Sequence, residues 1–144
     1  MRDVCATVAF IDIDHLHGFI PWMPIEQAVP LNIKNGIAVA RNFIAAGIDV
    51  VFGYPLSDED FNYVGSLIDF ECDVSGITLF CSLEKNIQNR GERELSEWEV
   101  NRIKWMHEHG LARPVFSEII DTTNRGIDET VRIIIEKCRL KRKQ

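Results

Sequence analysis

The chain of 144 residues contains no lysine followed by serine or threonine, so the phosphate-binding loop G-x-x-x-x-G-K-[ST] is absent from it. A cysteine pair motif is also lacking: Cys5, Cys72, Cys81 and Cys138 are widely spaced and form no C-x-x-C pair, which argues against a disulfide framework or a cysteine metal site. No apolar run approaches the ~20 residues that a membrane span needs, and the N-terminus lacks a signal-peptide layout. These absences predict a cytoplasmic protein with no membrane contact.

The composition that is present belongs to an ordinary globular protein, 46% hydrophobic and 26% charged. At this length we expect one compact domain over residues 1–144. The formal net charge of −6 argues against a nucleic-acid-binding surface over the whole protein, so a nucleic-acid partner is not expected. The basic tail after Glu136 is predicted to be the solvated last turn of a helix, with a phosphate or nucleic-acid contact as the alternative.

Short apolar runs alternate with amphipathic stretches along the chain. Strands are predicted at 6–13, 48–53, 76–82 and 118–121, and helices at 31–46, 58–70, 96–109 and 128–139. Residues 14–30, rich in proline, are predicted to form a structured loop with room for a short helix. Gly47 is expected to cap the helix before it, and Ser57 with Asp60 resembles a capping box. This alternation predicts an α/β fold: a parallel sheet with helices on both faces.

Polar residues follow each predicted strand, and in such a sheet they converge at the carboxyl edge. They are Asp12 and Asp14, residues 53–57, residues 82–86 and residues 122–124. Asp12 and Asp14 are spaced so that both side chains share one face of a strand. His15 and His17 beside them are candidate metal ligands, although the glycine and proline that follow favour a loop.

Two segments carry a resemblance to a known family. They are Leu79-Phe80-Cys81-Ser82-Leu83-Glu84, with Arg90, Arg93 and Arg102 after it, and Ile120-Asp121-Thr122-Thr123, with Glu129-Thr130-Val131 after it. Together they resemble small-molecule kinases of the P-loop superfamily, such as shikimate, gluconate and chloramphenicol phosphotransferases. The resemblance covers nearly the whole chain, although each motif is short. It implies a three-layer, incomplete P-loop NTPase-like fold in which residues 84–110 form a lid-like segment.

The resemblance implies catalytic roles for the acidic pair. Asp12 and Asp14 match the acids that end the second strand of those kinases, where one holds the substrate hydroxyl or assists its deprotonation and the other binds metal-coordinated water. Asp14 is therefore a candidate magnesium ligand. The alternatives are an acidic strand end exposed to solvent, or Asp14 as the cap of a following turn.

Nucleotide-binding roles are implied for four further residues. Arg90 and Arg93 match the mobile lid, Arg102 lies on the helix that follows, and Thr123 matches the loop that packs against adenine. Guanidinium groups suit the lid because they pair bidentately with phosphate oxygens. The alternatives are that the arginines pair with nearby glutamates, as Arg102 can with Glu99, and that the threonine loop caps the last helix.

The first strand of these kinases and its phosphate-binding loop are missing from the sequence, and residues 1–7 match the tail of the helix that should follow the loop. The missing strand lies centrally, between the strands at 48–53 and 76–82, so its loss leaves unpaired backbone groups. Those strands then pair directly, receive a strand from another chain, or leave a loose oligomeric fold, and a homodimer through the gap is the expectation. A truncated gene, or a true start upstream of Met1, would explain the gap.

ATP and magnesium are the cofactors that the resemblance implies, and the missing loop implies that both are lost. The predicted function is an incomplete small-molecule-kinase-like domain without phosphotransfer activity. One alternative is a non-enzymatic module that binds a small molecule in the acidic pocket. Another is a phosphotransferase whose nucleotide site is completed by a partner chain.

Overall fold

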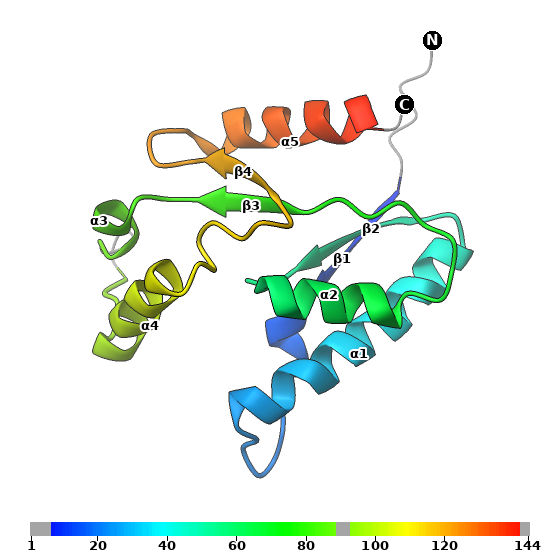
Figure 1. Cartoon of the computed structure of the whole chain (residues 1–144), viewed down its shortest axis with the longest axis horizontal. Helices are drawn as coiled ribbons and strands as arrows, with labels where there is room; N and C mark the ends of the chain where they lie inside the picture. Colours follow the sequence, from blue (N-terminus) through cyan, green and yellow to red (C-terminus); the bar gives the residue numbers. More distant parts are fainter. Residues whose placement is uncertain (1–6, 89–92, 142–144) are drawn as a thin grey trace. The chain divides into compact units, whose positions relative to one another are not determined.

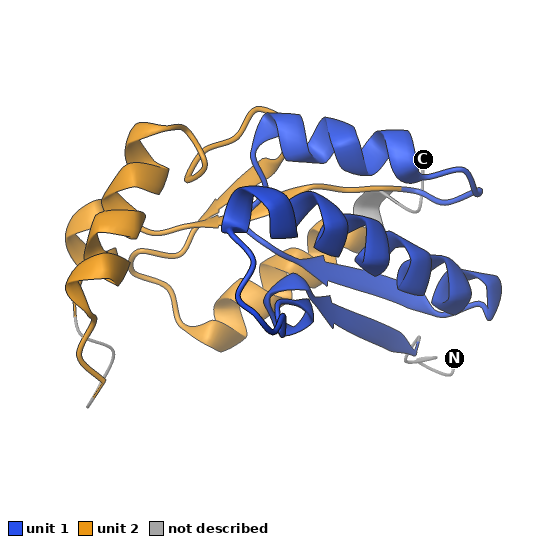
Figure 2. Cartoon of the chain, turned by 90° about the horizontal axis from the view of Figure 1, so that it is seen from below, with its two compact units in different colours: residues 1–73 blue, residues 74–144 orange. Residues whose placement is uncertain are grey.

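The computed structural model describes residues 7–88 and 93–141 of the chain. Where the composition predicts one compact domain, internal contacts divide the chain into two compact units, Met1–Asp73 (unit 1) and Val74–Gln144 (unit 2) (Figure 2). In the described residues each unit holds one parallel pair of strands. Unit 1 pairs β1 (Val8–Asp12) with β2 (Asp49–Gly53), and unit 2 pairs β3 (Ile77–Phe80) with β4 (Glu118–Asp121) (Figure 1).

The predicted order of strands and helices is confirmed, and so is the mixed α/β class with parallel strand pairing. The helices are η1 (Ile13–Leu16, a 3-10 helix), α1 (Ile25–Ala45), α2 (Asp58–Leu67), α3 (Leu83–Asn86), α4 (Glu97–Glu108) and α5 (Ile127–Lys141). None of those within the described residues has the length and apolar content needed to cross a membrane. β2 and β3 belong to different sheets there, so the direct pairing of these two strands is not observed.

The core of unit 1 lies between α1, α2 and the β1–β2 pair. Ile33 and Ile37 of α1 are buried together with Val64 of α2. Gly36 lies on the same face of α1, where a Cβ atom would be only 2.7 Å from both Ile13 Cδ1 and Phe52 Cε2. The missing side chain therefore lets α1 approach the sheet closely.

The first helix begins earlier than the sequence indicates. α1 starts at Ile25, so the prediction of a loop as far as Pro30 is wrong over residues 25–30. The backbone N–H groups of Gln27 and Ala28 donate to the Pro24 carbonyl, and Ala28 is fully buried. Burial of this turn outweighs the missing N–H of Pro30, which proline patterns alone do not reveal.

The predicted helix ends are confirmed in detail. Gly47 has φ +74°, the left-handed conformation expected of a glycine after a helix. Ser57 and Asp60 form a reciprocal capping box at the start of α2, with Asp60 N–H donating to Ser57 Oγ at 3.0 Å. A second such box, formed by Ser96 and Glu99, begins α4.

Unit 2 has a thin core by comparison. Among its described residues the buried apolar side chains are Ile120 on β4, at 4% exposure, and Pro114. α4 contains no buried residue in this part of the chain, whereas α1 buries a continuous face. Helices with few buried contacts open more readily, so α4 is the less protected of the two.

We expect Gly47→Ala to lower the free energy of unfolding by about 1 kcal/mol, because alanine is strained in the left-handed conformation. The matched control is Gly65→Ala inside α2, where a Cβ atom meets nothing within 4 Å. That control should raise the free energy of unfolding by about 0.5 kcal/mol, because alanine favours helix over glycine. Urea unfolding followed by circular dichroism measures both, and stabilisation by both substitutions would contradict the placement of Gly47.

Amide hydrogen exchange should separate α1 from α4. We expect amides in the middle of α4 to exchange at least about tenfold faster than those around Ile37, because exchange follows local opening and α4 buries no residue. Mass spectrometry after a deuterium pulse measures this. Equal protection of the two helices would show that α4 is covered by a contact that its burial does not reveal.

Candidate functional site

The acidic pair lies where β1 gives way to η1. Asp12 is the N-terminal cap of η1, and its Oδ1 atom accepts a hydrogen bond from the Asp14 N–H at 3.0 Å. Because β1 ends at Asp12 and Asp14 lies in η1, the prediction that both side chains share a strand face is wrong. Asp12, rather than Asp14, caps the turn. Both side chains reach solvent, Asp12 with an exposed fraction of 31%.

The two histidines have separate partners. His15 Nδ1 lies 3.8 Å from Asp12 Oδ2, which makes an ion pair when the imidazole is protonated. His17 Nε2 lies 3.2 Å from the Met23 carbonyl oxygen, and because a carbonyl only accepts, this nitrogen carries the proton. The His17 ring also lies against Trp22, with 4.4 Å between ring centroids. The two imidazoles therefore do not converge on one point beside Asp12.

Metal binding finds little support in these contacts. Across residues 7–88 and 93–141 there is no group of three or more His, Cys, Asp or Glu side chains that could hold an ion. Magnesium is often bound through one or two carboxylates plus water and phosphate oxygens. The role of Asp14 in binding magnesium stays a prediction. It depends on a bound molecule that supplies phosphate oxygens, because the described side chains do not supply a complete coordination shell.

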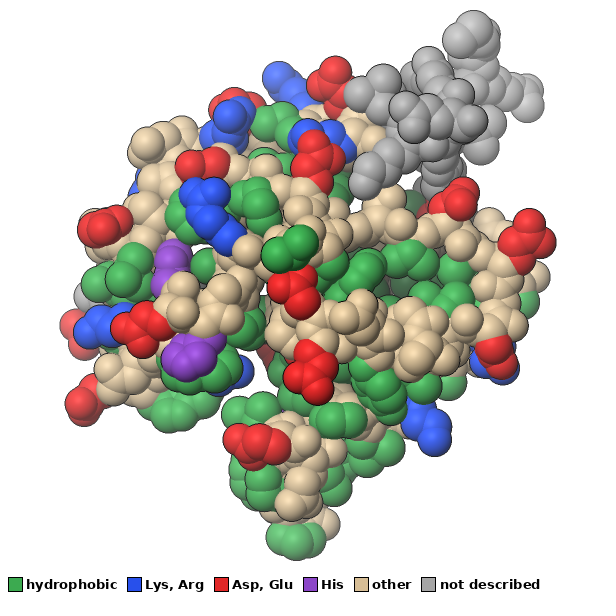
Figure 3. Space-filling view, viewed as in Figure 1, with side chains coloured by type: hydrophobic (Ala, Val, Ile, Leu, Met, Phe, Trp, Pro, Cys, Tyr) green, Lys and Arg blue, Asp and Glu red, His purple; other side chains and the backbone are tan. Residues whose placement is uncertain are grey.

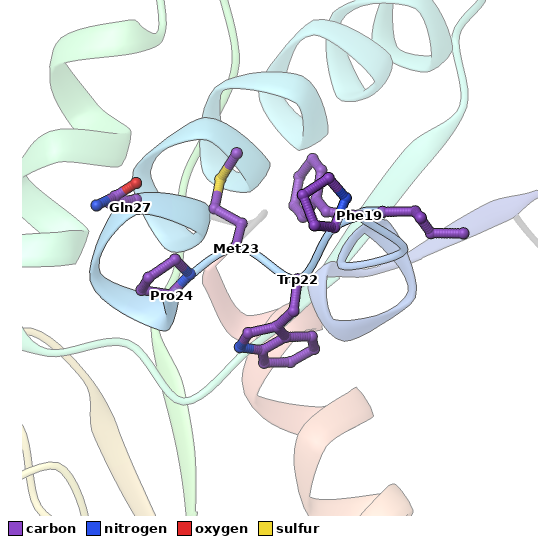
Figure 4. A pocket seen from close by; sticks show the side chains of 7 residues that line it. Phe19, Trp22, Met23, Pro24 and Gln27 are labelled. Atoms are coloured by element: carbon purple, nitrogen blue, oxygen red, sulfur yellow. The ribbon is translucent and has the colours of Figure 1, made fainter.

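An open surface cavity of about 320 Å³, with mostly apolar side chains around it, lies in the loop between η1 and α1. It is lined by Phe19, Ile20, Pro21, Trp22, Met23, Pro24 and Gln27. Figure 4 shows Trp22 and Met23 pointing to opposite sides of the loop backbone, with Gln27 contributed by α1. The exposed fraction of Trp22 is 68%, so its indole is available to a ligand. The volume is at the small end of the ~300–1,000 Å³ range of small-molecule pockets.

The unit that carries this cavity is strongly acidic. Residues 1–73 contain eleven Asp and Glu against three Lys and Arg, a formal charge of −8, whereas residues 74–144 contain eleven against thirteen, a formal charge of +2. On the face seen in Figure 3, the surface at the bottom of the view, formed by the loop and the start of α1, shows hydrophobic side chains and an acidic one. The cavity therefore belongs to a unit of negative formal charge, although its own lining contains no charged side chain.

The predicted nucleotide residue Thr123 is engaged within unit 2. Its Oγ1 accepts a hydrogen bond from the Ser82 N–H at 2.9 Å, and its own N–H donates to Asp121 Oδ1 at 2.9 Å. The Lys85 ammonium donates to its carbonyl oxygen. α5 begins at Ile127, so Thr123 ties the ends of β3 and β4 together instead of capping the last helix.

Two of the three arginines with a predicted nucleotide-binding role lie within the described residues. Arg90 lies outside the described residues. Arg93 forms an ion pair with Glu99, as the glutamate-pairing alternative predicts. The guanidinium carbon of Arg102 lies 4.4 Å from the ring centroid of Trp105, an arrangement that favours a cation–π contact. Arg93 and Arg102 therefore have local partners on or near α4.

Sequence reasoning missed a cluster at the end of β3. The guanidinium carbon of Arg113 lies 3.7 Å from the centroid of the Phe80 ring, and the His107 ring lies 5.8 Å from that centroid. Hydrogen bonds from Thr123, with Arg113 and Arg125 nearby, hold the pKa of Asp121 below its ordinary value of 3.8. No motif in the sequence signals the contact of Arg113 with Phe80, because the two residues are distant in the chain.

Comparison of the chain with protein-family models, with curated proteins and with solved structures found no significant match.

We expect Thr123→Val to raise the pKa of Asp121 toward its ordinary value, because the Thr123 side chain is the largest cause of its depression. A depressed carboxyl pKa stabilises the fold above the unfolded-state value and loses that contribution as pH falls through the folded-state value. The variant should therefore lose less stability than the wild type as pH falls below 3.8. Carbon-13 NMR titration of the Asp121 carboxyl measures the shift.

The matched control for that titration is Thr122→Val, which removes a hydroxyl that donates to the Phe80 carbonyl at 2.9 Å and leaves Thr123 in place. It should leave the pKa of Asp121 depressed. An unchanged pKa in Thr123→Val would show that the threonine hydroxyl does not govern this carboxyl.

Proposed function

We propose that this chain is an incomplete small-molecule-kinase-like domain. By themselves these 144 residues do not transfer phosphate, and what they retain is the binding of a small molecule in unit 1 near the carboxyl end of β1. The ligand would bind in the cavity lined by Trp22, with Asp12 and Asp14 as its polar partners.

The strand pairing is the observation that carries the proposal. The kinase resemblance puts the missing strand between β2 and β3, so removing that strand leaves β1 paired with β2 and β3 paired with β4. Those are the two parallel pairs of the structure, with Asp12 in register with Gly53 and Phe80 with Asp121. In parallel sheets, ligands bind beyond the carboxyl ends of the strands, and the acidic pair lies at that end of β1.

The absence of phosphotransfer is supported by what the candidate nucleotide residues contact. Arg93 forms an ion pair with Glu99, and Thr123 accepts a hydrogen bond from the Ser82 N–H, so both residues have local partners within unit 2. Catalysis of phosphoryl transfer depends on backbone and lysine donors around the phosphates, and the sequence contains no loop of the required form. The carboxylates of Asp12 and Asp14 instead suit a hydroxyl or an ammonium group of a ligand.

A second candidate is a phosphotransferase whose nucleotide site is completed by a partner chain, including a second copy in a homodimer. The observation that favours it is that β2 and β3 each have a single strand partner among the described residues. Edge strands of this kind accept further strands from other chains. A strand inserted there that brings its own phosphate-binding loop would supply the missing donors.

Calorimetric titration of the purified chain with ATP, with and without magnesium, tests the proposal. We expect no binding in the micromolar range under either condition, because the phosphate donors are missing. Micromolar binding would contradict the proposal and favour the second candidate. A strand–phosphate-loop–helix segment from a related kinase, co-expressed with the chain, should bring ATP binding if the fold is kinase-like; failure of that co-expressed pair to bind ATP would favour a plain binding module.

Asp12→Asn separates the same candidates by activity. If a partner chain restores phosphotransfer, this substitution should abolish turnover while leaving the fold intact, because asparagine retains the cap at η1 but cannot take a proton. Circular dichroism checks the fold, and a phosphotransfer assay with the partner present measures turnover. Unchanged turnover would remove Asp12 from the catalytic role.

A further inference from the structure

The loop cavity lies in a stretch of the chain that contains carboxylates and lacks lysine and arginine. No lysine or arginine occurs between Arg2 and Lys34, a stretch that holds Asp12, Asp14, Glu26 and the whole cavity lining. The next cation after Lys34 is Arg41, near the other end of α1, and it is paired with Asp69. The histidines in this stretch are His15 and His17, and His17 donates to a backbone carbonyl. A negatively charged ligand would find no lysine or arginine from this stretch to pair with.

The aromatic part of the cavity has the chemistry to receive a positive charge. Phe19 and Trp22 are both among the lining residues, and the indole of tryptophan is the strongest cation–π partner among side chains. The His17 ring lies against both, 4.4 Å from Trp22 and 5.5 Å from Phe19 between centroids, and is fastened by its hydrogen bond to Met23. These contacts hold the loop around a site instead of leaving Trp22 as an isolated exposed side chain.

We propose that the ligand of this cavity is a small organic cation, an ammonium group attached to an apolar ring or chain. The apolar part would lie against Trp22 and Phe19, and the negative charge of Asp12, Asp14 and unit 1 as a whole would select the positive group. This inference rests on the proposed function, because it names the ligand class of the same site. An anionic ligand is not expected at this site, because pockets that bind carboxylate or phosphate groups are commonly lined by arginine.

Three soluble probes of nearly the same shape test the charge preference: benzylamine, which is a cation at neutral pH, benzyl alcohol and benzoate. We expect benzylamine to shift the NMR signals of the Trp22 indole and of backbone amides in residues 17–27, with an affinity at least about tenfold above that of benzyl alcohol. Benzoate should shift none of them. Because the preference is electrostatic, the affinity for benzylamine should fall as salt is added.

Substitutions assign the binding to named groups. Trp22→Leu should lower the affinity for benzylamine at least about tenfold, and Asp14→Asn should lower it without altering the weaker binding of benzyl alcohol. The matched control is Trp98→Leu on α4, whose exposed fraction of 64% is close to the 68% of Trp22. That control should leave the affinity unchanged, and an equal loss in it would overturn the assignment.

The outcomes distinguish this inference from the proposed function. Equal affinity for benzylamine and benzyl alcohol at Trp22 would overturn the cation preference while keeping a small-molecule site in unit 1. Binding of benzoate at Trp22 would overturn it as well. If no probe shifts any signal from residues 17–27, both the ligand class and the retained binding fail, whereas the ATP titration judges the kinase-like nature of the chain separately.

Discussion

The close approach of α1 to the β1–β2 pair is the contact on which the functional part of the molecule depends. It exists because Gly36 has no side chain, so that Ile13 of η1 and Phe52 of β2 can pack against the helix backbone. Ile13 is itself almost completely buried, which anchors η1 directly after the acidic end of β1. The chain that leaves η1 must then return to the start of α1, and that return forms the aromatic loop.

One buried group in this region has no partner within the described residues. Asn32, one turn before Gly36 on α1, is 1% exposed, and its Oδ1 atom accepts no hydrogen bond there. A buried unpaired acceptor costs about 1–3 kcal/mol, so its presence in an otherwise apolar helix face is unfavourable for folding alone.

The sequence predicts the elements better than it predicts the site. Strand positions, the cap at Gly47 and the capping box at Ser57 were readable because each depends on residues a few positions apart. The acidic end of β1 was readable for the same reason. The prediction of the site failed where the geometry depends on long-range contacts. Thr123 accepts a hydrogen bond from Ser82 at the end of the neighbouring strand, and Arg113 lies over the Phe80 ring. Both contacts join residues more than thirty positions apart, and no periodicity or motif records them.

The sequence by itself determined the alternation of strands and helices, the acidic charge of its first half and the lack of a phosphate-binding loop, because these are properties of residue type and order. Tertiary structure decided where strand becomes turn after Asp12, and that His17 packs on Trp22 instead of joining His15 beside Asp12. The physical reason is burial. The free energy gained when Ile13 and Ala28 pack inside unit 1 outweighs the local preference of these segments for strand or loop. That packing places an aromatic cavity in the loop that follows two carboxylates.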